Sequence, residues 1–338
     1  MMLSLFKLNH LLMFSTHALC IYQRFLFSLL AIMIPYTALA EEPYKVGIAS
    51  WGGYPESVRG FKDGLAKAGL IENQNLVVVE GKIGANSELQ TEVAKNFNNA
   101  GLDLVFSLTT PGTAIFKSII SPETPIVFSV VTYPADSGLI ESFEYSGNNL
   151  VGTSNYVPIR NYLTLLKLIK PDTKTVAIFH RKGEPNSQIQ ASNMIRLLRK
   201  NQITPIDVQV ESIEEVKTAA MALVGKADLF MTTTDTLMQS GGEQALIDIS
   251  LDHSIPILSS NKKGINSGST FGPVADFYTL GKISGEKAAE ILLKGTKPTY
   301  LKSELQDPPL FLVNRSSLET LGIRLSEQAA KQVHWVNP

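Results

Sequence analysis

The stretch Ala227–Gln239, ADLFMTTTDTLMQ, predicts the fold more directly than any other part of the chain. Its first half is an apolar-to-hydroxyl run of strand length, which breaks at Asp235 into a segment with apolar residues at helical spacing. Such a junction is typical of open α/β sheets, where ligands bind beyond the carboxyl ends of the strands. We therefore expect Asp235 to lie at a ligand site.

A second copy of this pattern occurs earlier in the chain, at Leu102–Thr113, LDLVFSLTTPGT. When the two copies are aligned, Asp103 matches Asp228 and Thr110 matches Asp235. If the copies belong to two lobes, their strand ends would face each other across a cleft. The repeat thus predicts a protein that closes around a ligand.

Strands and helices alternate regularly through the rest of the chain, as in doubly wound parallel sheets. The chain changes lobe near 149–155, 269–273 and 295–309, which predicts two Rossmann-like lobes with parallel sheets joined by a three-segment hinge. The expected organisation is a signal peptide at 1–40, a first lobe at 44–153 and 274–300, a second lobe at 154–273 and 301–325, and a C-terminal tail at 326–338.

The first 40 residues read as a targeting segment. A basic region ends at Arg24, an apolar run covers 25–34, and Ala38-Leu39-Ala40 is a small-x-small cleavage pattern. We expect export to the periplasm with cleavage after Ala40; an uncleaved anchor is the alternative, and Met13 is an alternative start. Cys20 lies in this leader, so the mature chain would lack the thiols needed for thiolate catalysis or cysteine-based metal sites.

Composition limits the possible functions. The 338 residues are 44% apolar, enough for two domains, and a formal net charge of −1 does not favour nucleic-acid binding. The sequence contains no G-x-S-x-G, no H-E-x-x-H, no P-loop and no G-x-G-x-x-G after a strand. We therefore expect a non-enzymatic protein with no cofactor and no bound metal.

Candidate ligand contacts lie at the predicted strand ends. The carboxylate of Asp235 could pair with a ligand ammonium group, although Asp is also a preferred helix N-cap. Thr109 and Thr110 begin a helix whose N-terminus suits a carboxylate. Asn186 and Ser187 offer a similar helix end, again with plain capping as the alternative.

Four aromatic residues are expected to wall the cleft, although aromatic side chains more often fill cores. None of the predicted site turns contains an arginine, which disfavours a phosphorylated ligand. Glu184 is interpreted as a solvated loop charge. The four aromatic candidates are Trp51, Tyr54, Tyr133 and Phe271.

From Tyr44 to Ile323 the chain resembles the substrate-binding proteins of bacterial ABC importers, of the type I periplasmic-binding fold, and in particular members that bind tryptophan and other aromatic amino acids. The resemblance implies that Thr110, Asn186, Ser187 and Asp235 contact the ligand. It departs from the family at Tyr133, where aspartate is common, at Asn261, and in the loop at 51–54. The matching stretches are 60–65, 110–111, 125–129, 184–187, 234–235 and the late helix with Gly281, Gly285 and Glu286.

The sequence therefore predicts a monomeric periplasmic binding protein. It would close over a small molecule and deliver it to an ABC permease and its ATPase. The expected ligand is a zwitterion with an apolar or aromatic body, such as an amino acid. A sensory module that signals to a membrane kinase or cyclase is the alternative, because its pocket would look the same.

Overall fold

The computed structural model describes residues 42–336. The predicted leader at 1–40, with Cys20 and the cleavage pattern, lies outside these residues. Within 42–336, no helix has the length and apolar character needed to cross a bilayer.

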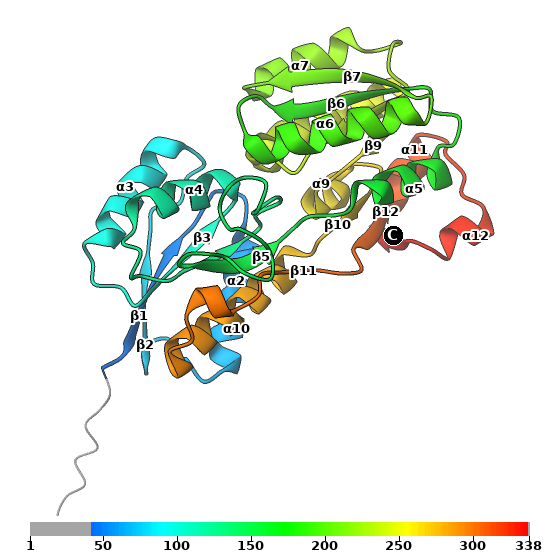
Figure 1. Cartoon of the computed structure of the whole chain (residues 1–338). Helices are drawn as coiled ribbons and strands as arrows, with labels where there is room; N and C mark the ends of the chain where they lie inside the picture. The colour runs from blue at the N-terminus through cyan, green and yellow to red at the C-terminus, as the bar shows by residue number, and fades with distance from the viewer. Residues whose placement is uncertain (1–41, 337–338) are drawn as a thin grey trace, which may run out of the picture. The chain divides into compact units, whose positions relative to one another are not determined.

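The first lobe is built on a six-stranded sheet in which every neighbouring pair is parallel (Figure 1). Its central strands are buried on both faces, which explains their continuous apolar sequence. The spatial order is β11 (Glu304–Leu305), β5 (Leu150–Ser154), β4 (Ile126–Ser129), β3 (Leu104–Leu108), β1 (Tyr44–Ala49) and β2 (Leu76–Glu80).

Two pairs of helices cover this sheet (Figure 1). Side chains alternate between the faces: Phe106 packs in the cluster shared with α2 and α10, and the adjacent Val105 packs in the cluster shared with α3 and α4. The helices are α2 (Pro55–Lys67), α3 (Ser87–Asn98), α4 (Thr110–Ile119) and α10 (Phe277–Lys294), with a 3₁₀ turn, η2, at Pro298–Tyr300.

Helices α2 and α10 pack with their backbones in direct contact, because glycines face each other along the interface. A Cβ atom at Gly60 would lie 2.1 Å from the carbonyl oxygen of Tyr278, and one at Gly281 would lie 2.0 Å from that of Ser57. No side chain fits at these positions without moving a helix.

We expect Gly281→Ala to lower the free energy of unfolding by about 1–3 kcal/mol or more, because overpacking forces the backbones apart. Lys282→Ala, a partly exposed neighbour on the same helix, is the control and should change it by no more than about 0.5 kcal/mol. Urea unfolding of both variants measures the difference. Equal stability of the two variants would show that the helices separate at little cost.

The second lobe is built on a seven-stranded sheet, and here the prediction of parallel sheets is only partly correct. Strand β10 pairs antiparallel with β12, and the other neighbours are parallel. The order is β13 (His334–Val336), β12 (Leu310–Asn314), β10 (Phe271–Val274), β9 (Ile257–Leu258), β8 (Leu229–Thr232), β6 (Thr175–Arg181) and β7 (Thr204–Val210).

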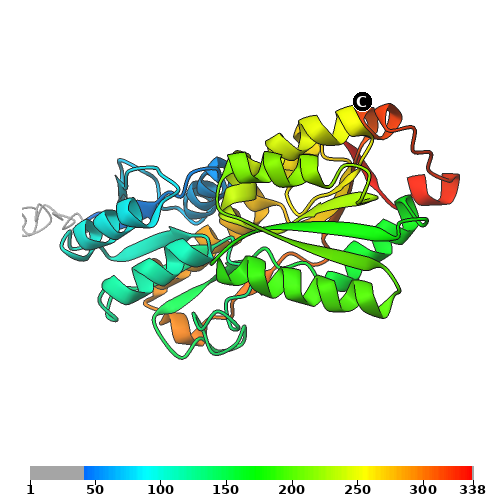
Figure 2. The same ribbon diagram turned by 90° about the horizontal axis from the view of Figure 1, so that it is seen from above.

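Helices lie on both faces of this second sheet (Figure 2). Leu229 and Met231 point into a cluster with α5 and α6, and Phe230 points into the opposite cluster with α7 and α8. The helices are α5 (Ile159–Ile169), α6 (Pro185–Lys200), α7 (Ile213–Ala222), α8 (Glu243–His253), α9 (Lys262–Ser267), α11 (Arg315–Thr320) and α12 (Glu327–Ala330), with a wide π-type turn, η1, at Met238–Gly242.

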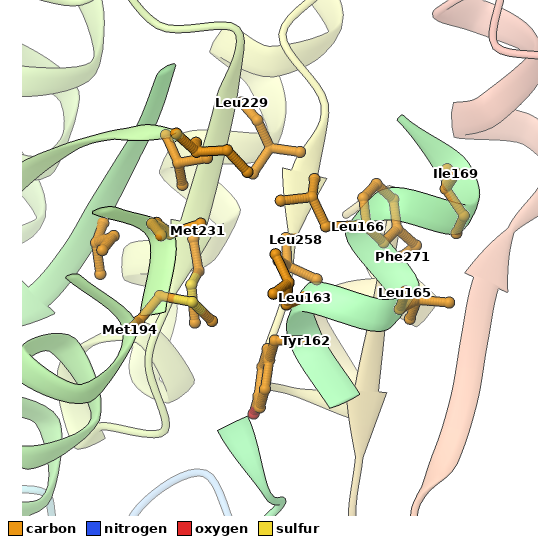
Figure 3. Close-up of a cluster of buried hydrophobic side chains, with 14 of the residues drawn as sticks. Tyr162, Leu163, Leu165, Leu166, Ile169, Met194, Leu229, Met231, Leu258 and Phe271 are labelled. Atoms are coloured by element: carbon orange, nitrogen blue, oxygen red, sulfur yellow. The ribbon is translucent and has the colours of Figure 1, made fainter. Parts of the chain in front are cut away.

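The expectation that Phe271 walls the cleft is wrong. Phe271 begins β10, is fully buried, and packs in the apolar cluster that includes Leu166 and Leu258 (Figure 3). Its short strand could present the side chain to either face of the sheet, so its sequence position did not distinguish core from cleft.

The chain crosses between the lobes at 155–158, 275–276 and 306–309. Asp276 connects these segments: it caps α10, contacts Lys262 of α9, and its backbone N–H donates to Gln306 at 2.7 Å. Two expected boundaries are corrected. β11, within 301–325, pairs with the first sheet, and β13, within the predicted tail 326–338, pairs with the second.

The structure confirms the internal repeat. In the first lobe, the carboxylate of Asp103 accepts the backbone N–H of Lys45 at 2.7 Å, which fixes the start of β3 beside β1. In the second lobe, the carboxylate of Asp228 accepts the N–H groups of Lys174 and Thr175, both at 2.8 Å. In each lobe an aspartate that accepts backbone N–H groups therefore fixes the start of the central strand. The carboxyl ends of β3 and β8 occupy equivalent positions in the two sheets.

Candidate functional site

The carboxyl ends of the two sheets meet in the structure. The hydroxyl of Thr132, which follows β4, lies 3.0 Å from that of Thr234, which follows β8. At a second point the side-chain amide of Gln239 donates to the carbonyl oxygen of Gly53 at 3.1 Å. The two strand edges predicted to carry the ligand contacts are thus in direct contact.

On the first lobe, the site is formed by the start of α4. Thr109 has a φ of 68°, and its hydroxyl accepts the N–H of Gly112 at 3.2 Å, so this residue caps the helix. The next hydroxyl, on Thr110, is buried and has no partner among the described residues. The indole of Trp51 lies against Gly112, where a Cβ atom would be 3.0 Å from the ring. The six-membered ring of Trp51 therefore packs beside the N-terminus of α4, and its indole N–H has no partner among the described residues.

On the second lobe, two side-chain amides have a fixed orientation. Asn186 donates from Nδ2 to the carbonyl oxygen of Thr234 at 2.5 Å, and Gln239 donates from Nε2 to that of Gly53. Backbone carbonyls only accept hydrogen bonds, so the remaining atoms, Asn186 Oδ1 and Gln239 Oε1, are acceptors. Both are buried and have no partner within residues 42–336.

Asp235 is fully buried. Its Oδ1 accepts the N–H of Met238 at 2.8 Å, as in an N-cap, and its Oδ2 accepts the N–H of Arg181 at 3.1 Å and the hydroxyl of Thr233 at 2.7 Å. Burial raises the pKa of Asp235, and these donors oppose the shift. The carboxyl therefore has the capping role considered from the sequence and contributes charge to the site.

Glu184 is a site residue that the sequence reasoning missed. It was interpreted as a solvated loop charge, yet its side chain is 5% exposed and accepts the N–H and the hydroxyl of Thr236, at 3.2 and 2.5 Å. Burial, and then the charge of Asp235, raise the pKa of Glu184 to about 7. The guanidinium of Arg181 lies 3.8 Å from Glu184 and is about one-third exposed. The second lobe thus holds two adjacent buried carboxyls.

Two of the four aromatic candidates, Tyr54 and Tyr133, lie near residues of the second lobe, whereas Trp51 packs in the core cluster of the first lobe. The ring of Tyr54 packs on Phe277 with centroids 5.4 Å apart, and burial followed by the charges of Glu184 and Asp235 raises the pKa of its phenol. Trp51 lies at the start of α4, as described above. Tyr133 packs on Tyr156 at 5.3 Å and hydrogen bonds to Asn193 of α6. The aromatic wall therefore spans both ends of the contact between the lobes.

The remaining predicted contact, Ser187, has a structural role. Its hydroxyl donates to the carbonyl oxygens of Arg181 and Glu184, at 2.8 and 3.0 Å, and so fixes the turn before α6. The structure thus assigns local capping to Ser187 and Thr109, whereas Trp51, Thr110 and Asn186 each have a buried polar atom without a partner among the described residues.

Buried polar atoms without a partner are concentrated at the carboxyl ends of the strands, where the two sheets face each other. Such atoms are rare in folded proteins, and each costs about 1–3 kcal/mol unless something satisfies it. Within residues 42–336, five of the nine such side-chain atoms lie at the facing strand ends and the first crossing: Trp51 Nε1, Thr110 Oγ1, Asn155 Oδ1, Asn186 Oδ1 and Gln239 Oε1. Sequence reasoning missed Asn155 and Gln239, although Gln239 ends the stretch that predicted the fold.

The chemistry of these atoms divides by lobe. Trp51 Nε1 only donates, and together with Thr110 and the N-terminus of α4 it suits an anionic acceptor such as a carboxylate. Asn186 Oδ1 and Gln239 Oε1 accept, and beside two buried carboxyls they suit a cationic donor such as an ammonium group. No group of three or more His, Cys, Asp or Glu side chains within 42–336 is arranged to hold a metal ion.

Comparison with known proteins agrees with this architecture. The family model for ABC transporter substrate binding proteins matches residues 48–336. The chain belongs to this family. A tyrosine-binding protein of Clostridioides difficile is 26% identical over 282 residues, which cover 82% of this chain and 81% of the relative.

Two solved structures share the fold of this substrate-binding protein, although their sequence identity to it is low. A conserved domain protein from Vibrio cholerae aligns with a TM-score of 0.82 at 22% identity, covering 88% of this chain and all of the other. An ABC domain from Streptococcus pneumonia in complex with L-Trp aligns with a TM-score of 0.80, at the same identity and coverages. Both likenesses support the two-lobed α/β fold.

Proposed function

We propose that this substrate-binding protein acts outside the cytoplasm and captures a free amino acid with an apolar or aromatic side chain between its lobes. It then delivers this ligand to an ABC permease and its ATPase. The observation that carries the proposal is that each lobe has buried polar atoms without a partner in the described part of the chain. Those of the first lobe require an acceptor and those of the second lobe require a donor. An α-amino acid presents a carboxylate acceptor and an ammonium donor on one carbon.

The charges support the same orientation. The carboxylate would bind at Thr110, Trp51 and the N-terminus of α4, where the helix dipole favours an anion. The ammonium group would face Asn186 and Gln239, with Asp235 and Glu184 behind them. The names of the tyrosine-binding relative and of the L-Trp complex are consistent with such a ligand.

The experiment is a thermal-shift screen of the exported form, without residues 1–40, against amino acids, sugars, nucleosides and oligopeptides. A ligand that binds only the folded state stabilises it by about 2.7 kcal/mol at a hundredfold excess over Kd. We expect aromatic amino acids to raise the melting temperature most. Stabilisation by sugars or nucleosides alone would contradict the proposal, as would consumption of the ligand by the protein.

A further inference from the structure

Asn155 has an unsatisfied side-chain oxygen that neither end of the proposed zwitterion uses. It directly follows β5 at the first crossing between the lobes, is 4% exposed, and its Oδ1 has no partner among the described residues. The local turn does not depend on it, because Ser154 donates its hydroxyl to Thr132 at 2.9 Å and accepts the N–H of Tyr156 at 3.0 Å. The amide of Asn155 is thus free to bind something else.

The place of Asn155 in the sheet separates it from the carboxylate site. The strand order β5-β4-β3 puts Asn155 two strand spacings from Thr110, about 9–10 Å. An aromatic side chain that starts from a carboxylate at Thr110 covers such a distance. The intervening strand β4 leads into Thr132 and Tyr133, so the path between the two points runs along an aromatic wall.

Aromatic rings and hydroxyl groups surround Asn155. Its neighbour Tyr156 packs on Tyr133, which also contacts Asn193 of α6, and the Thr132–Thr234 hydroxyl pair joins the lobes beside it. A polar atom in such a place is costly unless a partner arrives with the ligand.

On the basis of the proposed function, we propose that Asn155 recognises a hydroxyl group at the far end of the ligand's aromatic ring. Asn155 is then the residue that distinguishes a phenolic amino acid, tyrosine, from phenylalanine. A hydroxyl both donates and accepts, so it satisfies the amide of Asn155 in either orientation. A phenyl ring would leave that amide buried and unpaired, and sites built around such a hydrogen bond reject the analogue that lacks it.

Calorimetric titration of the exported form with L-tyrosine and with L-phenylalanine tests this inference. The wild-type protein should bind tyrosine about ten- to a hundredfold more tightly than phenylalanine. In Asn155→Leu, which is similar in size and apolar, this preference should disappear through weaker binding of tyrosine. Asn155→Asp, which keeps an acceptor at the same place, should retain a preference for tyrosine.

Thr110→Val is the matched control. It removes a hydroxyl at the carboxylate end and should weaken both ligands by a similar factor, leaving their ratio unchanged. Equal affinities of wild type for the two ligands, or an unchanged ratio in Asn155→Leu, would overturn the role of Asn155 while leaving the proposed function intact. Failure of both ligands to bind wild type would overturn the role of Asn155, and failure of every apolar and aromatic amino acid in the thermal-shift screen would overturn the proposed function.

Discussion

Asp235→Asn is expected to weaken ligand binding about ten- to a hundredfold and to lower the free energy of unfolding by about 1–3 kcal/mol. The loss of affinity follows from removing a buried carboxyl group behind the proposed ammonium site. The loss of stability follows from the geometry of Oδ2, which accepts from both Arg181 and Thr233. An amide group at this position would turn its N–H donors toward the backbone N–H of either Arg181 or Met238.

Asp228→Asn is the matched control for this substitution. Asp228 also accepts two donors with one oxygen, but it lies at the opposite end of β8, away from the facing strand ends. We expect a smaller loss of stability, because Asp228 is exposed and water can satisfy its donors, and no change in affinity. Chemical unfolding and calorimetric titration of both variants separate the two effects. If Asp235→Asn is destabilised but binds the ligand as tightly as wild type, Asp235 is only a helix cap.

Ligand affinity is expected to rise as the pH increases from about 5.5 to 8, because Glu184 must be ionised to favour the ammonium group. Its pKa in the empty protein is raised to about 7 by burial and then by Asp235. Below that pH the carboxyl is protonated, and binding a cation must expel the proton. The affinity should therefore change by up to about tenfold per pH unit below pH 7 and level off above it.

The raised pKa of Glu184 gives the folding stability of the protein without ligand the opposite pH dependence to that of the affinity. The pKa of this carboxyl is raised from its ordinary value of 4.5 to about 7, so the folded state binds more protons than the unfolded state in this range. Its contribution to stability therefore falls as the pH rises from about 4.5 to about 7. In Glu184→Gln both dependences should be reduced, and affinity at pH 8 should be lower than in wild type. Calorimetry from pH 5.5 to 8.5 measures this. A flat affinity profile in wild type would remove Glu184 from recognition of the ligand.

The sequence predicted the fold well because its main signals are local and repeated. The matching positions of Asp103 and Asp228 imply two lobes, and both aspartates fix the start of a central strand. The C-terminal boundaries were less accurate because β11 and β13 are only two and three residues long. Strands this short carry too little alternation to show which sheet they join.

The sequence indicated which strand ends carry polar residues better than it indicated which of these residues are buried. Strand ends identified Thr110 and Asn186, since polar residues after a buried strand are a local pattern. Burial depends on contacts that are distant in sequence even within one lobe: Glu184 is buried against Thr236, and Phe271 against Leu166 and Leu258. Asn155 was missed because it lies in a crossing segment, where the sequence has neither strand nor helix periodicity.

The central claim is that a single zwitterion satisfies free donors on one lobe and free acceptors on the other. Calorimetric titration with L-tyrosine, its methyl ester and its N-acetyl derivative tests it most directly, because each derivative removes one charge. We expect L-tyrosine to bind with one site per chain and each derivative to bind at least about tenfold more weakly, the loss of one charge-assisted contact. Binding of either derivative with the affinity of L-tyrosine would contradict the claim.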